Sequence, residues 1–432
     1  MVNPLMSKDL LLELFREAYR NLELQPLLSQ KELDKFKVDY GNNIIEKLML
    51  LVDDSPSGDC KIIFTGHRGC GKSTLLADFS RRYEKQYFMV FFSIGDTIEM
   101  SDVNHINILF TTAVNLIHEA EKHQISIPKS IKEVFSKWFA TKTSIKENKL
   151  QGSASVGFDF KFISAKLKAD NVTRNEIKQE FQNKISELVS HINEIAAVIQ
   201  TETKKEIIVI LDDLDKLDLG KINDLFKDNI KALCLPHFRI IFTIPIAALR
   251  DKFLKAILET ETNYRIVLPV VKLLNKGETR ESNILPILEA KTTLYDILKK
   301  RIPETILDTK TAEKIVLYSG GVLRELIRIA NECCIICLGK VRRIKDNETL
   351  IINDIILEEA INNLRNDFAT PLTKLDYEIL QQIYQFNEPD DPNQGYFLEL
   401  LHGLHVIEYH DYRNWYDIHP IVLELLRERK LI

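Results

Sequence analysis

The sequence predicts an α/β protein in which helices cover a parallel β-sheet, followed by an all-helical region and a small C-terminal domain. Two observations predict it. From residue 61 to about residue 271, short apolar runs rich in β-branched residues alternate with helical patterns. This alternation is typical of a parallel sheet covered on both faces. From about residue 281 the pattern becomes helical, until two short strands appear near the end of the chain.

Five apolar runs predict the strands of the sheet, at residues 61–65, 87–93, 206–211, 238–243 and 265–271. The main helices predicted between the strands cover residues 71–83, 105–122, 220–233 and 245–258. Helical periodicity also runs through residues 7–52, ahead of the first strand, and a further helix is predicted at 322–338, after Gly320-Gly321. The chain therefore enters the sheet through a helical segment and leaves it into more helices.

The last segment, residues 369–432, changes rhythm. Its predicted elements are two helices, two short strands around a turn and a final helix, at 375–386, 396–404, 406–410, 415–419 and after Pro420. Helices followed by a hairpin indicate a winged-helix domain. We therefore expect four parts: an N-terminal helical segment, a sheet core with an insertion at about 124–205, a helical lid and the winged helix, at 1–58, 59–275, 276–368 and 369–432.

Composition sets limits on the class of protein. The 432 residues are 45% hydrophobic and 28% charged, which suits a folded protein. The net charge of −5 is mild and by itself argues neither for nor against nucleic-acid binding. No apolar run reaches membrane-spanning length, and the N-terminus lacks a signal-peptide pattern. The six cysteines are scattered, which indicates reduced thiols and a cytoplasmic location.

The stretch from Gly66 to Ser73, which we call the phosphate loop, fits G-x-x-x-x-G-K-[ST] between a predicted strand and a predicted helix. Its glycines let backbone N–H groups face phosphate oxygens, Lys72 reaches the outer phosphates, and the Ser73 hydroxyl is placed for Mg²⁺. The following helix points its positive end at the anion. The residues expected to bind the nucleotide here are Gly66, His67, Arg68, Gly69, Cys70, Gly71, Lys72, Ser73 and Thr74.

A pair of acids supplies the second half of a nucleotide site. Asp212 follows the apolar run at 206–211, and its carboxylate can hold Mg²⁺ opposite Ser73. Asp213 comes next and could orient or deprotonate the attacking water. Paired acids are also common at the ends of strands. The pair indicates a nucleotide site only because a phosphate loop lies upstream in the same chain. ATP and Mg²⁺ are the expected cofactors.

The insertion has its own pattern and charge. Val156, Phe158, Phe160 and Phe162 alternate with polar or small residues, which predicts a half-buried strand or hairpin, and helices are predicted at 126–140 and 173–200. Residues 128–180 carry a net charge of +5, whereas residues 371–432 carry −6. The insertion is therefore either a solvated surface or a contact for a partner, a nucleic acid or a second copy. The acidic winged helix is poorly equipped for DNA.

In these motifs and their order, the sequence resembles AAA+ P-loop ATPases. The segments GHRGCGKST, IIVILDDLDKL, FRIIFTIP and SGGVLRELIRIA look most like the replication-initiator-like branch and the related STAND (NLR-type) switch ATPases. The resemblance covers about residues 35–432. It implies that Lys72 and Ser73 are the Walker A residues, and that Asp212 and Asp213 are the Walker B pair. Many family members have Glu where this chain has Asp213, which leaves rapid hydrolysis in question.

The resemblance also implies roles for residues farther along the chain. Thr243 falls where these families sense the γ-phosphate, and Arg324 falls where AAA+ proteins place a second sensor arginine in the lid. Arg265 and Arg250 are candidates for an arginine finger, although a surface position explains either. His419 lies where STAND proteins place a histidine that contacts the β-phosphate of ADP; the alternative is a helix-capping or packing histidine.

The sequence therefore favours a slow ATPase that works as a molecular switch, with its nucleotide state coupled to lid movement and to assembly with itself or a partner. Such switches act, for example, in anti-phage defence or stress signalling. One alternative is an initiator or loader that acts on DNA, and another is a nucleotide-binding scaffold without significant turnover. The pathway, the activating signal and the oligomeric state are not encoded in any motif we recognise.

Overall fold

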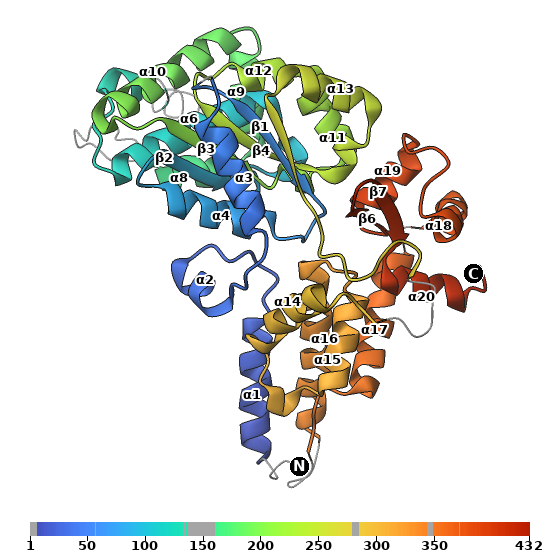
Figure 1. Ribbon diagram of the computed structural model, residues 1–432. Coiled ribbons are helices and arrows are strands. Elements are labelled where there is room, and N and C mark those ends of the chain that lie inside the picture. Colours follow the sequence, from blue (N-terminus) through green and yellow to red (C-terminus); the bar gives the residue numbers. More distant parts are fainter. Residues whose placement is uncertain are drawn as a thin grey trace. The chain divides into compact units, whose positions relative to one another are not determined.

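The computed structural model describes residues 7–56, 58–132, 135, 160–278, 285–343, 349–370 and 372–432 (Figure 1). The chain forms two compact units. The first, here called the sheet unit, comprises Asn43–Thr65 and Leu76–Ile266. The second, the loop–lid unit, comprises Met1–Asn42, Gly66–Leu75 and Val267–Ile432. The phosphate loop therefore belongs to the same unit as the predicted lid, whereas the acid pair belongs to the sheet unit.

A five-stranded sheet carries the order β2-β3-β4-β1-β5. Its strands are β1 Lys61–Gly66, β2 Phe88–Ser93, β3 Ile207–Asp212, β4 Arg239–Pro245 and β5 Tyr264–Leu268. β2 pairs with β3 in parallel, with Val90 opposite Val209, and β3 pairs with β4 in parallel. Every residue of β1, β3 and β4 is buried, as expected of strands covered on both faces. The predicted class, a parallel sheet flanked by helices, is confirmed.

The described helices of the sheet unit are α3 Asn42–Asp53, α4 Lys72–Tyr83, α5 Ile94–Thr97, α6 His105–Lys122, α8 Phe160–Ala169, α9 Asn171–Phe181, α10 Ile185–Thr203, α11 Leu219–Asn223, α12 Ile230–Cys234 and α13 Lys252–Glu261. α4 begins in the phosphate loop, so its residues up to Leu75 belong to the loop–lid unit and the rest to the sheet unit. α6 packs against β2 and against α8, α9, α10 and α12, and most of its residues are buried. It therefore connects the sheet to the insertion.

Two predicted helices are broken in the structure. The segment 220–233 forms α11, a π-helical turn at Asp224–Asp228 and then α12, because the Asn229 side chain donates to the Asp224 carbonyl and closes the turn. The segment 245–258 forms a 3-10 turn at Ile246–Leu249 before α13. Asp251 starts α13 by accepting two main-chain N–H groups, which satisfies the donors at a helix N-terminus.

The predicted strand in the insertion is wrong where the structure describes it. Phe160 and Phe162 lie on α8, whose buried residues Ile163 and Leu167 are four apart, the spacing of a helix face. Phe160 stacks on His118 of α6, with ring centroids 3.6 Å apart. Val156 and Phe158 lie outside the described residues, as does part of the helix predicted at 126–140. The helix predicted at 173–200 is divided into α9 and α10.

A buried arginine fixes the turn between α8 and α9. The Arg174 guanidinium donates to the Asp102 carboxylate from Nε and Nη2, at 3.0 and 2.5 Å. Its Nη1 donates to the main-chain carbonyls of Leu167 and Lys168, both at 2.7 Å. Charge-assisted bonds of this kind are among the stronger hydrogen bonds in proteins. The described part of the insertion is therefore attached to the sheet unit rather than loosely tethered.

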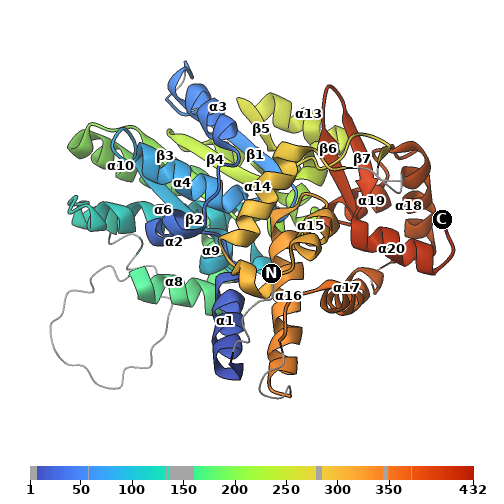
Figure 2. The same cartoon turned by 60° about the horizontal axis from the view of Figure 1, so that its bottom comes forward.

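The helices of the loop–lid unit before the C-terminal segment are α1 Lys8–Asn21, α2 Gln30–Phe36, α14 Leu288–Lys299, α15 Thr309–Tyr318, α16 Leu323–Val341 and α17 Asp354–Ala369. α16 packs against both α15 and α17 and also along α1 (Figures 1 and 2). Asn331 on α16 donates to the Leu22 carbonyl at the end of α1. The N-terminal helix is thus part of the lid's packing.

The buried face of α16 includes a cluster of thiols. Cys333, Cys334 and Cys337 are buried in this helix, and burial raises the pKa of the Cys337 thiol to about 12. A thiol with a raised pKa is a poor metal ligand and nucleophile. These cysteines serve as small apolar residues in the core of the lid.

The C-terminal segment has the predicted order of elements: α18 Lys374–Phe386, α19 Gly395–His402, β6 Val406–His410, β7 Asn414–Ile418 and α20 Pro420–Glu428. β6 and β7 form an antiparallel hairpin with Glu408 opposite Tyr416. α18 packs against β7, and α19 packs against β6. This arrangement is the one expected of a winged helix, which stays our interpretation of the segment.

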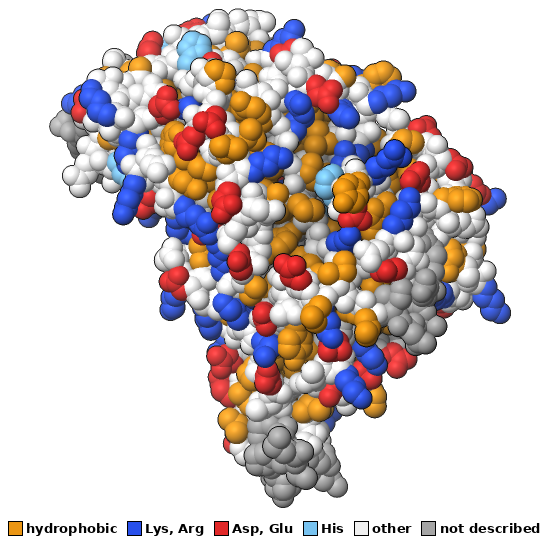
Figure 3. All heavy atoms as spheres, viewed as in Figure 1, with side chains coloured by type: hydrophobic (Ala, Val, Ile, Leu, Met, Phe, Trp, Pro, Cys, Tyr) orange, Lys and Arg blue, Asp and Glu red, His pale blue; other side chains and the backbone are white. Residues whose placement is uncertain are grey.

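The surface in Figure 3 carries both signs of charge. On the face shown, Lys and Arg side chains are interspersed with Asp and Glu. Interspersed charges keep a protein soluble but give little local potential for binding a polyanion. Among the described residues, no helix combines the length and the apolar character needed to cross a bilayer.

Candidate functional site

The phosphate loop turns sharply between β1 and α4 because two of its glycines take backbone conformations that other residues avoid. Gly69 has φ 85° and Gly71 has φ 100°, both in the left-handed region. Space is limited as well: a Cβ built on Gly69 would lie 2.4 Å from the Cβ of Arg324. A glycine is therefore required at position 69 for both its conformation and its close contact with the lid.

Lys72 is the buried cation of the loop, whereas Arg68 is exposed. The Lys72 ammonium donates to the main-chain carbonyls of Gly66 and His67, at 3.0 and 2.8 Å. Phosphate oxygens carry more charge than these carbonyls and would compete for the same three N–H donors. Lys72 also begins α4, so the positive end of the helix lies at the same place. A buried ammonium and a helix N-terminus therefore meet at one place in the loop, which is the arrangement expected of a phosphate site.

The loop also contacts distant parts of its own unit. The Arg324 N–H on α16 donates to the Gly69 carbonyl at 3.0 Å. The Glu408 N–H on β6 donates to Nε2 of His67 at 2.7 Å. Directly after the loop, the Thr74 hydroxyl accepts a hydrogen bond from the N–H of Leu27 at 3.0 Å. The lid helix and the C-terminal hairpin therefore both bind the loop directly.

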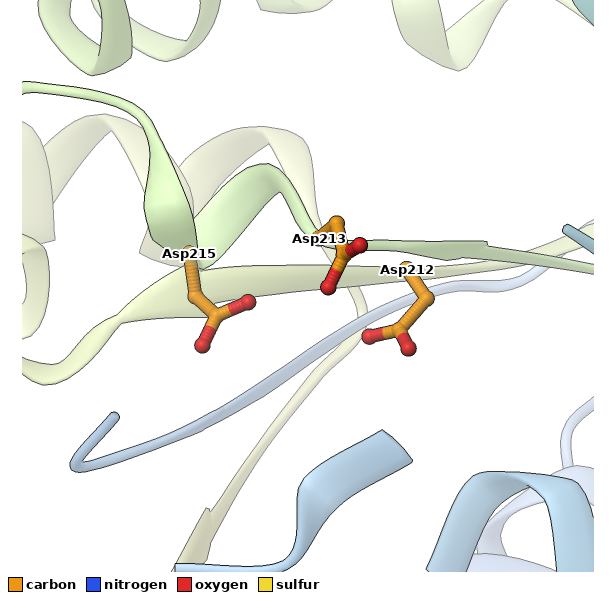
Figure 4. Close-up of side chains that lie close together, drawn as sticks. All are labelled: Asp212, Asp213 and Asp215. Carbon is orange, nitrogen blue, oxygen red and sulfur yellow. The ribbon is translucent and has the colours of Figure 1, made fainter. Parts of the chain in front are cut away.

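The acid pair after β3 lies on a tight turn. Asp212 is the last residue of the strand, and Asp213 has φ 71°, a left-handed conformation that Asp tolerates better than most residues. A 3-10 turn at Leu214–Lys216 follows. As a result, Asp212, Asp213 and Asp215 each have a carboxylate oxygen within 4.8 Å of the others, on one side of the turn (Figure 4).

This acidic turn, Asp212–Asp215, fits a hard divalent cation. Mg²⁺ prefers oxygen ligands and is held in nucleotide sites by one or two carboxylates together with the substrate phosphates. Asp212 and Asp215 would supply such oxygens from the turn. Ser73, the other expected ligand, belongs to the loop–lid unit. When bound, Mg²⁺ would neutralise phosphate charge.

Two residues that our sequence reasoning missed bear on this turn. Asp215 was present in the D-D-x-D run, but only the turn geometry shows that it returns to the same side as the pair. Ser93, the last residue of β2, donates from its hydroxyl to the Asp213 carboxylate at 2.6 Å. The Lys216 ammonium lies 2.6 Å from the other Asp213 oxygen. The pairing of β2 with β3 brings Ser93 opposite Asp212, a contact that no local sequence signal encodes.

The structure places the other predicted residues as follows. Thr243 is fully buried within β4, and its hydroxyl donates to the Leu211 carbonyl at 3.2 Å. Arg324 lies on the first turn of α16, with its backbone on the phosphate loop. Arg265 is half-buried, with Nη1 3.5 Å from two carbonyls near the end of α13. Arg250 ends the 3-10 turn before α13. Their roles as sensors or finger stay predictions.

His419 has the helix-capping geometry. Its Nδ1 accepts the Ile421 N–H at 3.3 Å and so caps α20. The ring is fully buried, is stacked on Phe368, and has Nε2 3.9 Å from the Glu325 carboxylate. Burial, reinforced by the charge of Arg328, lowers its pKa to about 3, so this histidine is neutral at physiological pH. A contact between His419 and a nucleotide stays a prediction.

A glycine-rich loop between a buried strand and a helix, together with carboxylates at the end of another strand of a parallel sheet, defines a P-loop nucleotide-binding protein. The sequence model of the KAP family P-loop domain matches residues 41–263. The chain therefore belongs to the KAP family of P-loop proteins. This match confirms the P-loop recognition made from the motifs. No curated protein matches the sequence.

Several solved structures are similar over nearly the whole chain. Orc1 from Aeropyrum pernix, solved in complex with DNA, is 12% identical with a TM-score of 0.41, and the match covers 96% of this chain and 98% of that one. Cdc6p from Pyrobaculum aerophilum is 12% identical with a TM-score of 0.40, covering 94% and 97%. A point variant of RuvB from Thermotoga maritima is 12% identical with a TM-score of 0.38, covering 94% and 98%.

Proposed function

We propose that this chain is an ATP-binding and hydrolysing molecular switch of the AAA+/STAND class, whose nucleotide state is coupled to the lid and to assembly with itself or with a protein partner. The observation that carries the proposal is the bond from the Arg324 N–H to the Gly69 carbonyl. It joins the first turn of the lid helix α16 to the loop that receives the phosphates. This bond supports the proposal, because a movement of the loop would act directly on the first turn of α16.

The chemistry assigned to the residues follows from their types. Lys72 and the loop N–H groups bind the phosphates, Asp212 holds Mg²⁺, and Asp213 orients the attacking water. The Asp213 carboxylate is already engaged by Ser93 and Lys216. It is also one methylene shorter than the glutamate that many members of the AAA+ class have at this position. Both facts favour slow hydrolysis, which suits a switch better than a motor. Turnover near zero would make the chain a nucleotide-binding scaffold.

A second candidate function, nucleic-acid binding, has one observation in its favour. α8 carries Lys161, Lys166 and Lys168, of which Lys161 and Lys168 are exposed, within the basic segment 128–180. The C-terminal segment does not support it, since its helix α19 carries Glu399 and lacks Lys and Arg. The charge of the insertion is equally suited to an acidic protein surface, such as residues 371–432 of a second copy.

The deciding experiment measures molecular size and ATP turnover together. Light scattering coupled to size exclusion is run on the full chain with ADP, with a non-hydrolysable ATP analogue and with neither, in Mg²⁺. A change of size with the analogue, and ATP turnover slower than about one per second, which is slow for an enzyme, support the switch. Equal size in all three states and fast turnover would refute it. Single-stranded and double-stranded DNA, added in a parallel series, test the second candidate.

A further inference from the structure

The side chain of His67 contacts the C-terminal hairpin, although the phosphate-loop pattern requires no particular residue at this position. The residue is 3% exposed, and its Nε2 accepts the main-chain N–H of Glu408. Because a backbone N–H can only donate, Nε2 carries no proton in this bond. The neutral ring therefore spans from the phosphate loop to β6, a strand more than three hundred residues away in sequence.

The hairpin explains why the Glu408 N–H is free to make this bond. In antiparallel pairs, opposite residues alternate between bonding each other and pointing their N–H groups outward. Glu408 is opposite Tyr416, whose N–H donates outward to the Asn387 carbonyl at 2.9 Å. The Glu408 N–H likewise faces away from β7, toward His67. A buried donor without a partner is costly, and Nε2 of His67 supplies an acceptor for it.

A second hydrogen bond from β6 joins the hairpin to the start of the lid helix. Tyr409, the next residue on β6, donates from its hydroxyl to the Gly320 carbonyl at 2.7 Å, just before the lid helix. Complete burial raises its pKa, so the hydroxyl stays a donor. The lid helix returns to the phosphate loop through the Arg324–Gly69 bond. Loop, hairpin and lid are therefore joined in one ring of hydrogen bonds, all within the loop–lid unit.

We propose that His67 is an autoinhibitory latch, which holds the C-terminal hairpin on the phosphate loop. The latch stabilises the loop conformation in which the Lys72 ammonium is bound to the main-chain carbonyls of Gly66 and His67. Phosphate oxygens would compete with the carbonyls of Gly66 and His67 for the three donors of Lys72. A phosphate that takes the donor from the His67 carbonyl weakens the bond that holds this peptide to Lys72. Nucleotide entry and hairpin release are linked, and linkage acts equally in both directions. This regulation rests on the proposed nucleotide-binding function.

The test uses His67→Leu, which removes the acceptor at similar volume, and His67→Gln, whose amide oxygen can accept at about the position of Nε2. Amide hydrogen exchange of residues 406–410 is measured first, without nucleotide. His67→Leu should speed exchange there by about fivefold, the factor for one net hydrogen bond. His67→Gln should stay near wild type. Equal exchange in wild type and His67→Leu overturns the latch.

The second measurement is the association rate of a fluorescent ATP analogue in Mg²⁺. His67→Leu should bind about fivefold faster than wild type, because one net hydrogen bond no longer opposes loop opening. The analogue should also speed exchange at 406–410 in wild type more than in the variant. Tyr409→Phe separates coupling from a local effect, since Tyr409 lies outside the phosphate loop. It should also raise the association rate, by a smaller factor. An unchanged rate in Tyr409→Phe, with looser exchange, would overturn the coupling.

These outcomes can be told apart from a failure of the proposed function. If wild type binds no nucleotide by calorimetry, the proposed function fails. The exchange experiment without nucleotide then still decides whether His67 holds the hairpin. If wild type binds nucleotide but amide hydrogen exchange at residues 406–410 does not change on binding, the proposed function stands and the latch is refuted as a regulatory device.

Discussion

The phosphate loop and the acidic turn, which the sequence predicts to serve one nucleotide, belong to different compact units and are held in different ways. The loop is bound by residues far along the chain, through Arg324 on the lid helix and Glu408 on the hairpin. The acidic turn is held within the sheet unit, by Ser93 and Lys216 on Asp213. The acidic turn is therefore held by neighbouring strands of the sheet, whereas the conformation of the loop depends on its bonds to the lid helix and the hairpin.

The largest expected effect is on the loop. Lys72→Ala should weaken ATP binding at least about 100-fold, to below detection, because it removes a cation whose bonds to charged phosphate are each worth more than ordinary hydrogen bonds. Isothermal calorimetry with wild type and the exposed-site control Lys85→Ala checks it. Equal affinity in Lys72→Ala and wild type would remove the phosphate-loop assignment.

The next effect tests the acidic turn. Asp213→Asn should keep ATP bound and slow hydrolysis by about 100-fold, since the amide is similar in size but cannot act as a base. Asp212→Asn should instead raise the Mg²⁺ concentration needed for turnover. Phosphate release at a series of Mg²⁺ concentrations separates the two, with the exposed Asp228→Asn as control. If both variants hydrolyse at the wild-type rate, the turn does not serve the site.

A third prediction concerns pH and sharpens the role of the C-terminal segment. The folded-state pKa of His419 is about 3, below the ordinary value of 6.5. Between these two pH values His419 is protonated in the unfolded chain but neutral in the folded chain. This contribution to stability is complete above pH 6.5 and is lost as the pH falls toward 3. Between pH 7 and pH 5, His419 should cost the protein about 2 kcal/mol of unfolding free energy.

The variant His419→Asn tests this, because asparagine can still cap α20 but does not titrate. Urea unfolding at pH 7 and pH 5 should show a loss for wild type that exceeds the loss for the variant by about 2 kcal/mol. Glu325, Arg328, His405 and His67 all influence this histidine and are present in both proteins. Losses of equal size would mean that His419 is protonated in the fold.

The smallest expected effect is in the insertion. Replacing Lys161, Lys166 and Lys168 with Glu reverses the charge of α8 without touching its buried residues. We expect weaker self-association, with DNA binding absent from both proteins, because α8 already uses Phe160 to pack on α6 and offers charge for an acidic partner surface. Sedimentation at two salt concentrations measures it.

A control triple variant at Lys227, Lys231 and Lys252 changes the same charge elsewhere on the sheet unit. Salt-sensitive DNA binding that only the α8 variant loses, at unchanged size, would favour the nucleic-acid function instead. If neither size nor DNA binding responds, α8 is a solvated surface.

The sequence predicted the sheet well because each strand is a short, continuous apolar run. Such runs are typical of strands in a parallel sheet that is covered on both faces. The phosphate loop and the acid pair were also predictable, since their chemistry fixes both residue type and spacing. The insertion was not: the alternation from Val156 to Phe162 matched a strand, but packing of Phe160 on His118 and of Ile163 in the core favours a helix. Tertiary contacts override such short patterns.

What the sequence could not predict at the site were the partners supplied from a distance. Ser93 beside Asp213 depends on the register of β2 against β3. Glu408 beside His67 depends on which edge of a hairpin faces the loop. Neither contact leaves a spacing or a residue type that one sequence can reveal. The position of Asp215 could have been predicted, because a tight turn after β3 brings its carboxylate close to that of Asp212.

The closeness of Gly69 to the lid has a consequence for how the protein can vary. An added methyl group there would lie 2.4 Å from the Cβ of Arg324 and would act as a wedge between loop and helix. Yet position 69 is one of the freely variable positions of the general phosphate-loop pattern, which asks for glycine only at 66 and 71. In this chain two further constraints act on position 69: the left-handed backbone conformation of Gly69 and the first turn of α16 packed against it. Alanine at this position would leave Lys72 and the acids in the chain but would force the loop and α16 apart.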